Sequence, residues 1–362
     1  MKTYLRLFLT LTIVMLLAAG AAWAQTNFYI NASTGSNTYD GLSPTFTGGT
    51  NGPKATIQAA INAASSSGDI VNVAAGTYTE DLSIPSGKTN LDLVGAGTAS
   101  TTIKGVQNVV STSFPLAAPN IDILADGVKI HGFTIEGPNP ASGFYASGMV
   151  IGGSNVEIYN NAFKVPNASN TDDISQAIQT YRDGNGGAGD LSGLNIHDNT
   201  FTSLGSGTHG YEGIFLNHTP TDPTPSSTAT IATNQFTGNV FRGITSERSK
   251  TTISNNTINT DNLVANTFQG INVMDFNNRE QKDVTVTGNT VKGSAAGNGF
   301  TTGVRIGAAL NAQTLSNISV TNNIVQMGSV GVLVRSSPGG IVLNGNDLSG
   351  NSSFAVKNEP VT

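Results

Sequence analysis

Short apolar frames recur along most of this chain, and each is built around one asparagine. An aliphatic residue lies three positions before the asparagine and an apolar residue two positions after it, as in Ile196-His-Asp-Asn199-Thr-Phe201. The asparagines at the centres of these frames are Asn161, Asn199, Asn234, Asn256, Asn289, Asn323 and Asn346. Their successive spacings are 38, 35, 22, 33, 34 and 23 residues. A repeat of this length indicates a solenoid, a propeller or an array.

The segments that flank the asparagines predict strands rather than helices. Runs such as Val284-Thr-Val-Thr287 alternate β-branched apolar and polar residues, which is the period of a strand. Asn, Gly and Ser separate these runs, without a helical pattern between them. Spacings of 22 and 23 residues suit one turn of a three-strand coil, and the longer spacings add a loop. The sequence therefore predicts an all-β fold, a single-stranded right-handed parallel β-helix.

In such a coil, each asparagine lies over its counterpart in the next coil. Parallel strands are about 4.8 Å apart, so identical turns stack on one another. Asparagine tolerates the left-handed backbone conformation that a sharp turn needs. Its amide also offers donors and an acceptor that can bond along the stack. We therefore interpret the seven asparagines as structural.

The first 24 residues are predicted to be a secretory signal peptide. Lys2 and Arg6 form its basic end, residues 7–22 supply the apolar stretch, and Ala22-Trp-Ala24 is a small-residue cleavage site. A retained membrane anchor is the alternative. No later stretch is long and apolar enough to span a bilayer. We expect the processed chain to be secreted, either extracellular or at the cell surface, with the periplasm as an alternative.

A lead-in and a capping helix are expected in residues 25–68, ahead of a β-helix over residues 69–362. Residues 26–53 are rich in Gly, Ser, Thr and Asn and are interpreted as irregular. A helix is predicted over residues 56–64, where Ile57, Ala60, Ile61 and Ala64 share one face. Such a helix covers the first coil, whose edge would otherwise invite pairing with another chain. The next strands are predicted at residues 70–73, 82–84, 91–94 and 102–103, with a turn at residues 75–78.

Three early segments carry a family resemblance. They read Thr56-Ile-Gln-Ala-Ala-Ile-Asn-Ala-Ala64, Ile70-Val-Asn-Val-Ala-Ala-Gly-Thr-Tyr-Thr-Glu80 and Leu91-Asp-Leu-Val-Gly-Ala-Gly97. They resemble the opening of secreted right-handed β-helix proteins of the pectin-lyase-like superfamily, which includes the pectin methylesterases. With the later coils, the resemblance covers nearly all of residues 28–358. It implies the fold, whereas activity varies among proteins that share this fold.

The catalytic motifs of the family do not transfer to this chain. Asn259-Thr-Asp261 matches one motif of polygalacturonase-like hydrolases, but the paired aspartates and the Gly-His-Gly that should follow are missing. Pectin methylesterases need a Gln-Asp pair, whereas Gln176 is followed by Ala177. No family activity is therefore assigned from the sequence.

Composition excludes some classes of protein. Without residues 1–24, which hold two of the 17 basic and none of the 23 acidic residues, the net charge is 15 − 23 = −8. An acidic chain lacks the basic footprint of a nucleic-acid-binding protein. There is no cysteine, so disulfides are absent despite the expected secretory route. The apolar core and the backbone hydrogen bonds must therefore supply the stability.

A second recurrence places polar and charged residues on one sheet. A strand that begins with Gly or Ala and an apolar residue precedes each asparagine frame, as in Gly213-Ile-Phe-Leu and Gly243-Ile-Thr-Ser. Side chains alternate across a strand. Positions two and four after the first residue are therefore expected to face outward, and position five to enter the turn. These positions hold Tyr181, Arg182, Asn217, His218, Glu247, Arg248, Asp275 and Arg305.

Three interpretations of these residues stay open: a solvated face, a polysaccharide-binding groove and a catalytic site. On a solvated face, the ion pairs contribute little stability. In a groove, Tyr181 would stack on a sugar ring. The side chains expected to hydrogen-bond hydroxyls or carboxylates there are Arg182, Asn217, His218 and Arg305.

A catalytic site would use the same sheet in one of two ways. Glu247 and Asp275, on adjacent coils, would form the carboxylate pair of a hydrolase. In a lyase, the candidates to remove a proton are instead Arg248, Arg182 and His218. Neither cofactor nor metal is expected, because His209 and His218 have no carboxylate at ligand spacing. A calcium site at Asp183, Glu247 and Asp275 is unsupported, since arginines interleave.

We expect a secreted or cell-surface protein that recognises polysaccharide through one sheet face. The alternatives are a polysaccharide lyase or glycoside hydrolase, acting on pectin or another acidic polysaccharide in the same groove, and a structural or adhesion module. The sequence leaves open whether the chain is an enzyme. It ends after one partial strand, Phe354-Ala-Val-Lys357, with no visible cap. Solenoids generally need both ends capped, so we expect a continuation beyond Thr362, or else a partner on the last coil.

Overall fold

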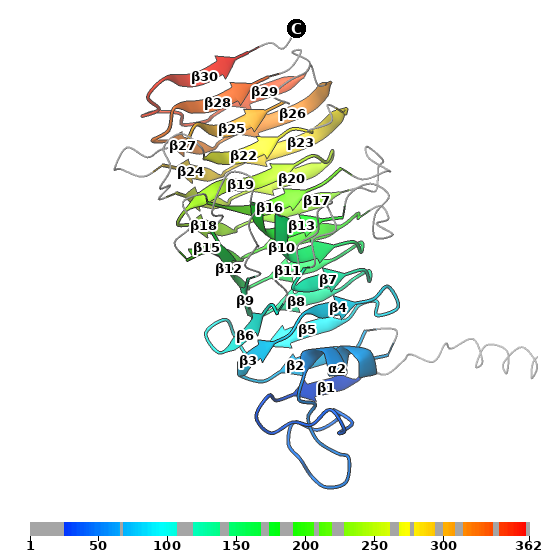
Figure 1. Cartoon of the computed structure of the whole chain (residues 1–362). Helices are drawn as coiled ribbons and strands as arrows, with labels where there is room; N and C mark the ends of the chain where they lie inside the picture. Colours follow the sequence, from blue (N-terminus) through cyan, green and yellow to red (C-terminus); the bar gives the residue numbers. More distant parts are fainter. Residues whose placement is uncertain are drawn as a thin grey trace, which may run out of the picture.

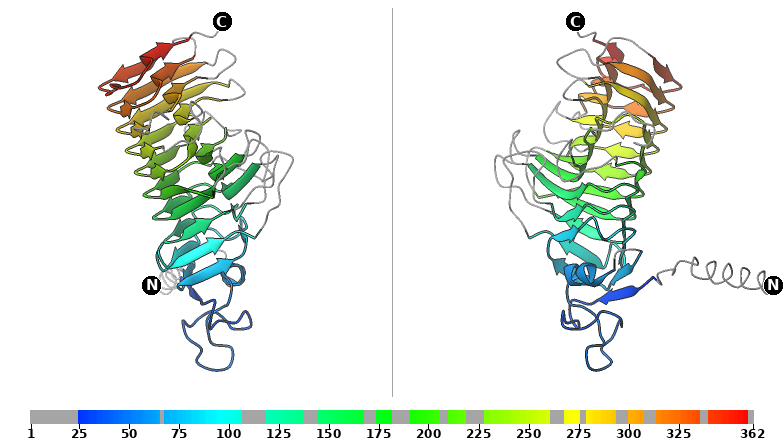
Figure 2. Two further views of the ribbon diagram at one scale, coloured as in Figure 1. Left: turned by 60° about the vertical axis from the view of Figure 1, so that its left-hand side comes forward. Right: turned by 90° about the vertical axis from the view of Figure 1, so that its right-hand side faces the viewer.

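A computed structural model describes most of the chain after residue 24. The described residues are 25–65, 68–106, 119–137, 145–167, 174–181, 191–205, 210–218, 228–260, 268–275, 279–293, 300–307, 314–335 and 340–359. Their strands form three parallel sheets that wind in sequence order as a right-handed parallel β-helix (Figure 1). Figure 2 shows the blue first strands and the red last strands at opposite ends of this coil. The predicted fold class is confirmed, whereas the predicted signal peptide lies outside the described residues.

Each coil contributes one strand to each sheet, which gives eleven, ten and nine strands among the described residues. The eleven-stranded sheet contains β1 (Asn27–Ile30), β2 (Ile70–Val73), β5 (Asp92–Gly95), β8 (Lys129–His131), β11 (Glu157–Tyr159), β14 (Leu194–His197), β17 (Ala229–Ala232), β20 (Thr251–Ser254), β23 (Gln281–Thr287), β26 (Leu315–Thr321) and β29 (Ile341–Asn344). The nine-stranded sheet contains β3 (Gly76–Thr79), β6 (Thr101–Lys104), β9 (Thr134–Glu136), β12 (Ala162–Pro166), β15 (Thr200–Leu204), β18 (Gln235–Thr237), β21 (Thr257–Asn259), β24 (Thr290–Lys292) and β27 (Ile324–Gln326).

The ten-stranded sheet is the one that carries the sequence-predicted site. It contains β4 (Leu82–Ile84), β7 (Ile121–Ile123), β10 (Tyr145–Ile151), β13 (Ile174–Thr180), β16 (Tyr211–Leu216), β19 (Val240–Ser246), β22 (Gln269–Val273), β25 (Thr302–Ile306), β28 (Val330–Val334) and β30 (Phe354–Asn358). Its strands pair in register, so residues tens of positions apart in the sequence become neighbours.

The core is a set of axial columns of like side chains. Phe163, Phe201 and Phe236 stack with ring centroids 4.8 and 4.5 Å apart and nearly parallel planes. All three are buried, and each occupies the apolar position two residues after a repeat asparagine. Ile158 pairs with Ile196 in the same way on the eleven-stranded sheet. Each coil therefore buries its apolar residues against the coils above and below.

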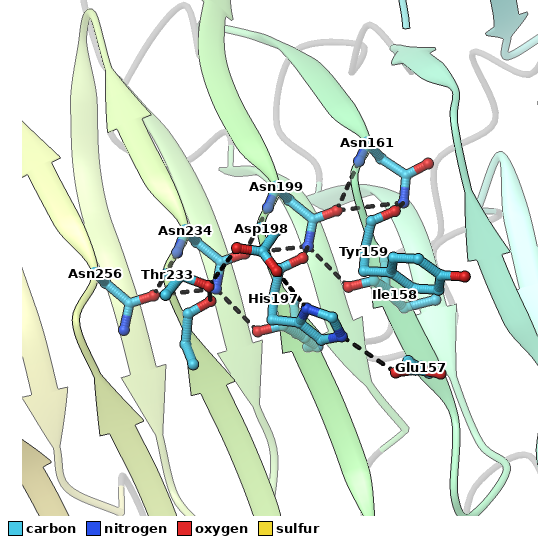
Figure 3. A network of polar contacts seen from close by, with 12 residues as sticks. Glu157, Ile158, Tyr159, Asn161, His197, Asp198, Asn199, Thr233, Asn234 and Asn256 are labelled. Carbon is cyan, nitrogen blue, oxygen red and sulfur yellow. Dashed lines mark hydrogen bonds and ion pairs between the residues drawn. The ribbon is translucent and has the colours of Figure 1, made fainter. Parts of the chain in front are cut away.

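The predicted asparagine stack forms a buried hydrogen-bonded ladder (Figure 3). The backbone N–H of Asn199 and its Nδ2 both donate to Oδ1 of Asn234, at 3.1 and 3.0 Å. The same Nδ2 donates to the carbonyl of Ile158, at 2.8 Å. Equivalent bonds continue from Asn161 through to Asn346. Each amide thus joins its own coil to both neighbouring coils.

The left-handed backbone conformation that was expected at these asparagines occurs one residue earlier. The positive φ angle belongs to the residue before each ladder asparagine, and the ladder asparagines have ordinary φ angles. The residues concerned are Asn160, Asp198, Thr233, Asn255, Gly288, Asn322 and Gly345, with φ between 51° and 66°. The bend at this preceding residue turns the following side chain inward, where its amide reaches the next coil.

Two local expectations at the start of the chain are corrected. The lead-in is not irregular throughout, because it contains β1, which pairs with β2 and buries Phe28 and Ile30. Residues 76–79, expected as part of a turn, form β3 and pair with β6. In both cases an alternating apolar residue finds a place in the core, which outweighs the local turn signals.

The capping helix is confirmed as α2 (Ile57–Ala63), with Thr56 as its N-cap. Ile57 and Ile61 are buried against the first coil. The Glu80 carboxylate accepts the N–H groups of Ile57 and Gln58 at 2.8 and 3.0 Å, which satisfies two unpaired donors of the helix start. Within the described residues, no helix is long and apolar enough to cross a membrane.

The eleven-stranded sheet carries a stack of aromatic side chains on its outer side (Figure 3). Tyr159 lies between His131 and His197, with centroid distances of 4.5 and 5.2 Å. His197 contacts the carboxylates of Glu157 and Asp198, at 3.2 and 2.7 Å. His131 and His197 thus occupy ordinary strand positions and have protein partners.

Removal of one ladder amide should lower the free energy of unfolding, because it leaves buried groups of the neighbouring coil without their hydrogen-bond acceptor. In Asn256→Ala, the N–H and Nδ2 of Asn234 lose the oxygen to which both donate at 3.0 Å. We expect the free energy of unfolding to fall by about 2–4 kcal/mol, as measured by urea denaturation. The control is Asn195→Ala on the outer side of β14, which should change it by less than about 0.5 kcal/mol. Equal effects of the two substitutions would contradict the structural role of the ladder.

Candidate functional site

One row of side chains on the ten-stranded sheet points away from the core and is nevertheless buried. This outer row consists of Gln179, Phe215, Thr245, Asn272 and Arg305, one residue per coil in register. The residues just before them, such as Ile178 and Ile271, belong to the core, so the outer row faces the opposite side of the sheet. Its members are between 0% and 7% exposed. Strand alternation therefore predicted their direction correctly but not their burial.

A second row of polar residues runs beside the outer row. It consists of Ser147, Gln176, Glu212, Arg242 and Gln269, again one per coil. Gln176 Nε2 donates to Glu212 Oε2 at 2.7 Å, and Arg242 forms an ion pair with the same carboxylate. Gln179 Nε2 donates to Ser147 Oγ and so links the two rows. Polar side chains therefore predominate in the two rows across the central coils, with Phe215 as the apolar exception.

The sequence analysis missed this second row, although a signal for it exists. Each of its members immediately precedes the Gly or Ala that begins the recurring strand motif. That small residue is required by packing: a Cβ at Gly213 would lie 2.4 Å from the Phe236 ring and 2.4 Å from the carbonyl of Gly243. The position before it could therefore have been read as a further column of the repeat.

Glu247 and Asp275 are brought together at the turn that follows the strands. Arg279 Nε donates to Asp275 Oδ2 at 2.8 Å, and its Nη2 lies 3.6 Å from Glu247 Oε2. Glu247 also accepts the backbone N–H of His218 at 3.4 Å. Glu247 is 3% exposed and Asp275 0%. Two buried carboxylates thus share one guanidinium.

Arg279 is another residue that sequence reasoning missed. It lies four residues after Asp275 and outside the strand positions that the repeat aligns. The repeat carries no information on such a loop residue. The only available signal was the opposite charge at this short spacing.

The side chain of Arg248 points away from Glu247 and Asp275. Its Nη2 donates to the carbonyl of Leu191 at 3.0 Å, and its side chain is fully buried. Its backbone N–H donates to Ser246 Oγ at 3.2 Å. The guanidinium therefore lies against the backbone that leads into β14, on the eleven-stranded sheet.

Tyr181 and Asn217 have structural contacts. The Tyr181 hydroxyl donates to Asp122 Oδ1 at 3.0 Å, and the ring packs over Gly152, where a Cβ would lie 2.9 Å away. Burial, with the adjacent Asp122 charge, raises the pKa of Tyr181 well above its usual value, and burial also raises the pKa of Asp122. Asn217 Nδ2 donates to the carbonyl of Thr180 at 2.6 Å. Arg182 lies outside the described residues.

These placements decide between some of the sequence-based interpretations. The solvated face is wrong for the described residues, because Glu247, Arg248 and Asp275 are buried rather than exposed. The structure brings Glu247, Asp275 and His218 together, and it separates Tyr181 and Arg248 from them. The described residues contain no group of three or more metal-ligating side chains. Glu247 and Asp275 already share an arginine, which makes them poor ligands for calcium.

Comparisons with known proteins agree with this architecture. Residues 46–165 match the Pectinesterase family model, which confirms the resemblance to pectin-lyase-like β-helix proteins. The matched region ends at β12, so it precedes Gln176, Glu212, Arg242 and Glu247. No curated protein sequence matches the chain.

Solved β-helix structures are similar over most of the chain at low sequence identity. A pectin methylesterase from carrot is 12% identical, with 94% of this chain and 90% of that chain covered and a TM-score of 0.47. A rhamnogalacturonan lyase is 13% identical, with 88% and 73% covered and a TM-score of 0.41. The A-module of a mannuronan C-5 epimerase from Azotobacter vinelandii is 16% identical, with 84% and 92% covered and a TM-score of 0.37.

Replacement of Arg279 should lower the free energy of unfolding, because it leaves two buried carboxylates without their shared cation. In Arg279→Met, Glu247 and Asp275 lose the cation that they share, and we expect the free energy of unfolding to fall by about 3–5 kcal/mol at pH 7. Urea denaturation measures this difference.

The control for this substitution is Lys129→Met, which breaks the ion pair of Lys129 with Glu157. The Lys129 side chain is 50% exposed, so its loss should cost less than about 1 kcal/mol. A loss in Arg279→Met that is as small as in the control would argue against a shared cation.

Proposed function

We propose that this chain binds a polysaccharide along the outer row and the second row of the ten-stranded sheet. The supporting observation is a set of buried polar atoms that have no hydrogen-bond partner in the described part of the chain. They are Gln179 Oε1, Gln269 Oε1, Asn272 Oδ1 and Arg305 Nη2. An unsatisfied buried polar atom costs about 1–3 kcal/mol. A ligand rich in hydroxyl groups would satisfy these atoms and recover that free energy.

The repeat of the rows favours a polymer over a small molecule. Successive members are one coil apart, about 4.8 Å, and they run along the axis of the β-helix. A linear polysaccharide also presents hydroxyl groups at regular intervals along its length. Hydrogen bonds on a face shielded from water are stronger than on an exposed surface. The match of residues 46–165 to the Pectinesterase family adds weight to a polysaccharide ligand.

Catalysis on the same face is the second candidate. Three buried carboxylates, of Glu212, Glu247 and Asp275, lie along it. A hydrolase needs a pair of carboxylates that reach the substrate, whereas Glu247 and Asp275 both pair with Arg279. Arg248, one of the three candidate bases of a lyase, is turned toward Leu191. The geometry therefore supports binding better than turnover.

Binding assays with variants of the outer row test this proposal. We expect Gln179→Ala and Asn272→Ala each to weaken binding to a retained polysaccharide by roughly two- to tenfold, the effect of one lost hydrogen bond. Affinity electrophoresis against a panel of neutral and acidic polysaccharides would identify that ligand and measure the change. Asn195→Ala on the eleven-stranded sheet is the matched control and should bind like the unaltered chain.

Product assays separate binding from catalysis. Incubation with the retained polysaccharide should release neither new reducing ends nor unsaturated products nor methanol. Turnover that Glu247→Gln abolishes would establish the enzymatic alternative instead. Retention of no polysaccharide at all would leave the structural or adhesion module.

We further propose that the chain is exported after removal of residues 1–24. The basic end, apolar stretch and small-residue site of that segment support this. Expression of the full chain in a host with a secretory pathway should yield a protein whose N-terminal residue is Gln25. Mass spectrometry of the purified protein checks this, and an intact Met1 would contradict it.

A further inference from the structure

A cavity of about 240 Å³ lies on the outer side of the eleven-stranded sheet, where the lead-in meets the first strands. Three of its lining residues are Tyr29, Asn72 and Val94, which pair in register on β1, β2 and β5. The residue before each of them belongs to the core, so these three side chains face outward. The cavity is therefore separate from the ten-stranded sheet and from its two polar rows.

The lead-in contributes one wall of this cavity through Pro44. The segment that carries Pro44 is tied to β1, because the Tyr29 N–H donates to the carbonyl of Gly41 at 2.8 Å. The Gly41 N–H in turn donates to the carbonyl of Gly52 at 2.9 Å. Figure 1 shows the lead-in in blue, next to β1. Backbone hydrogen bonds thus hold this wall in place beside the sheet.

The lining is small and uncharged. Ala74 and Ala96 directly follow β2 and β5, and their methyl side chains leave space between the sheet and the lead-in. Every described residue that lines the cavity is uncharged. Pro44 and Ala96 are exposed, so the cavity opens to solvent. An ionic ligand would lose its hydration here without gaining a counter-charge, which favours a neutral ligand.

Two polar atoms of the lining have no hydrogen-bond partner in the described part of the chain. Asn72 Nδ2 donates to Asn27 Oδ1 at 3.1 Å and to the carbonyl of Phe28 at 3.4 Å, which fixes the amide and leaves Oδ1 without a donor. The Tyr29 hydroxyl also has no partner among these residues. A wholly apolar ligand would displace water from both atoms without replacing its hydrogen bonds. The cavity therefore favours a ligand with both apolar and hydroxyl groups.

We propose that this cavity binds one neutral sugar ring of a glycan. The C–H groups on the face of a pyranose ring match the Tyr29 ring, Val94 and Pro44. Its hydroxyl groups match Asn72 Oδ1 and the Tyr29 hydroxyl. The volume of about 240 Å³ lies below the range of about 300–1,000 Å³ of sites for drug-sized ligands, so one ring fits better than a longer segment. This site goes beyond the proposed function of the ten-stranded sheet and does not depend on it.

A panel of neutral methyl hexopyranosides tests this inference by ligand-observed NMR titration of the purified protein. We expect a dissociation constant on the order of 1 mM for the tightest of them, as is usual for a ligand of this size. Its 6-carboxylate counterpart differs in one functional group and should bind at least about fivefold more weakly, because the cavity offers no partner for the charge. Equal or tighter binding of the acid would overturn the assignment to a neutral sugar.

Tyr29→Phe and Ala96→Trp test whether the sugar binds in this cavity. Tyr29→Phe removes only the hydroxyl, so we expect binding to weaken roughly two- to tenfold with an unchanged thermal denaturation midpoint. Ala96→Trp places a large ring at the cavity and should abolish binding. The matched control is Ala99→Trp, which puts the same ring at an exposed residue between β5 and β6 that does not line the cavity. It should bind like the unaltered chain.

Several other results would overturn the inference. These are no binding of any hexopyranoside, binding that neither Tyr29→Phe nor Ala96→Trp weakens, and an equal loss in Ala99→Trp. Tighter binding of indole than of every sugar would show an apolar site instead. None of these results would refute the proposed function, because retention of a polysaccharide through Gln179 and Asn272 is measured with different variants.

Discussion

The axial register of the coils is the constraint on which the rest of this structure depends. From Asn199 to Asn323, each ladder asparagine accepts two hydrogen bonds from the coil before it and donates to the coil after it, so these coils cannot slip relative to one another. A slip of one residue would turn every apolar side chain of a strand to the wrong face. The ladder and the apolar columns therefore fix the same register, one by hydrogen bonds and the other by packing.

The same register organises the polar face of the ten-stranded sheet. Because strands pair in register, each residue on this face has a neighbour in the next coil at a fixed distance, whatever the length of the intervening loop. Glu212 is thereby placed between Gln176 and Arg242, and both bond to its carboxylate. Arg305 is placed between Asn272 and Leu333, and neither can neutralise it. The pairing of charges on this face is thus decided by which residues share a column.

The sequence predicted those parts of the structure that obey the repeat. The apolar frames identified the β-helix, the Phe163 column and the buried asparagines, because each depends on a fixed position within the coil. The left-handed residue was placed one position too late, since the frame does not show which of two adjacent residues bends. Arg279 was missed because it belongs to a loop outside the repeat. The turn of Arg248 toward Leu191 follows from side-chain packing, which periodicity does not specify.

The burial of the outer row has a further physical consequence. Alternation along a strand shows which side of the sheet a residue faces, but it does not show whether that side is exposed to solvent. The sequence therefore left a solvated face with surface ion pairs open for Glu247 and Asp275, whereas the structure removes both from water. In a solenoid, stability is approximately a sum over coils and their nearest-neighbour contacts. Coils with well-packed columns, such as that of Phe201, can therefore stabilise a central region whose unpaired polar atoms would be too costly in isolation.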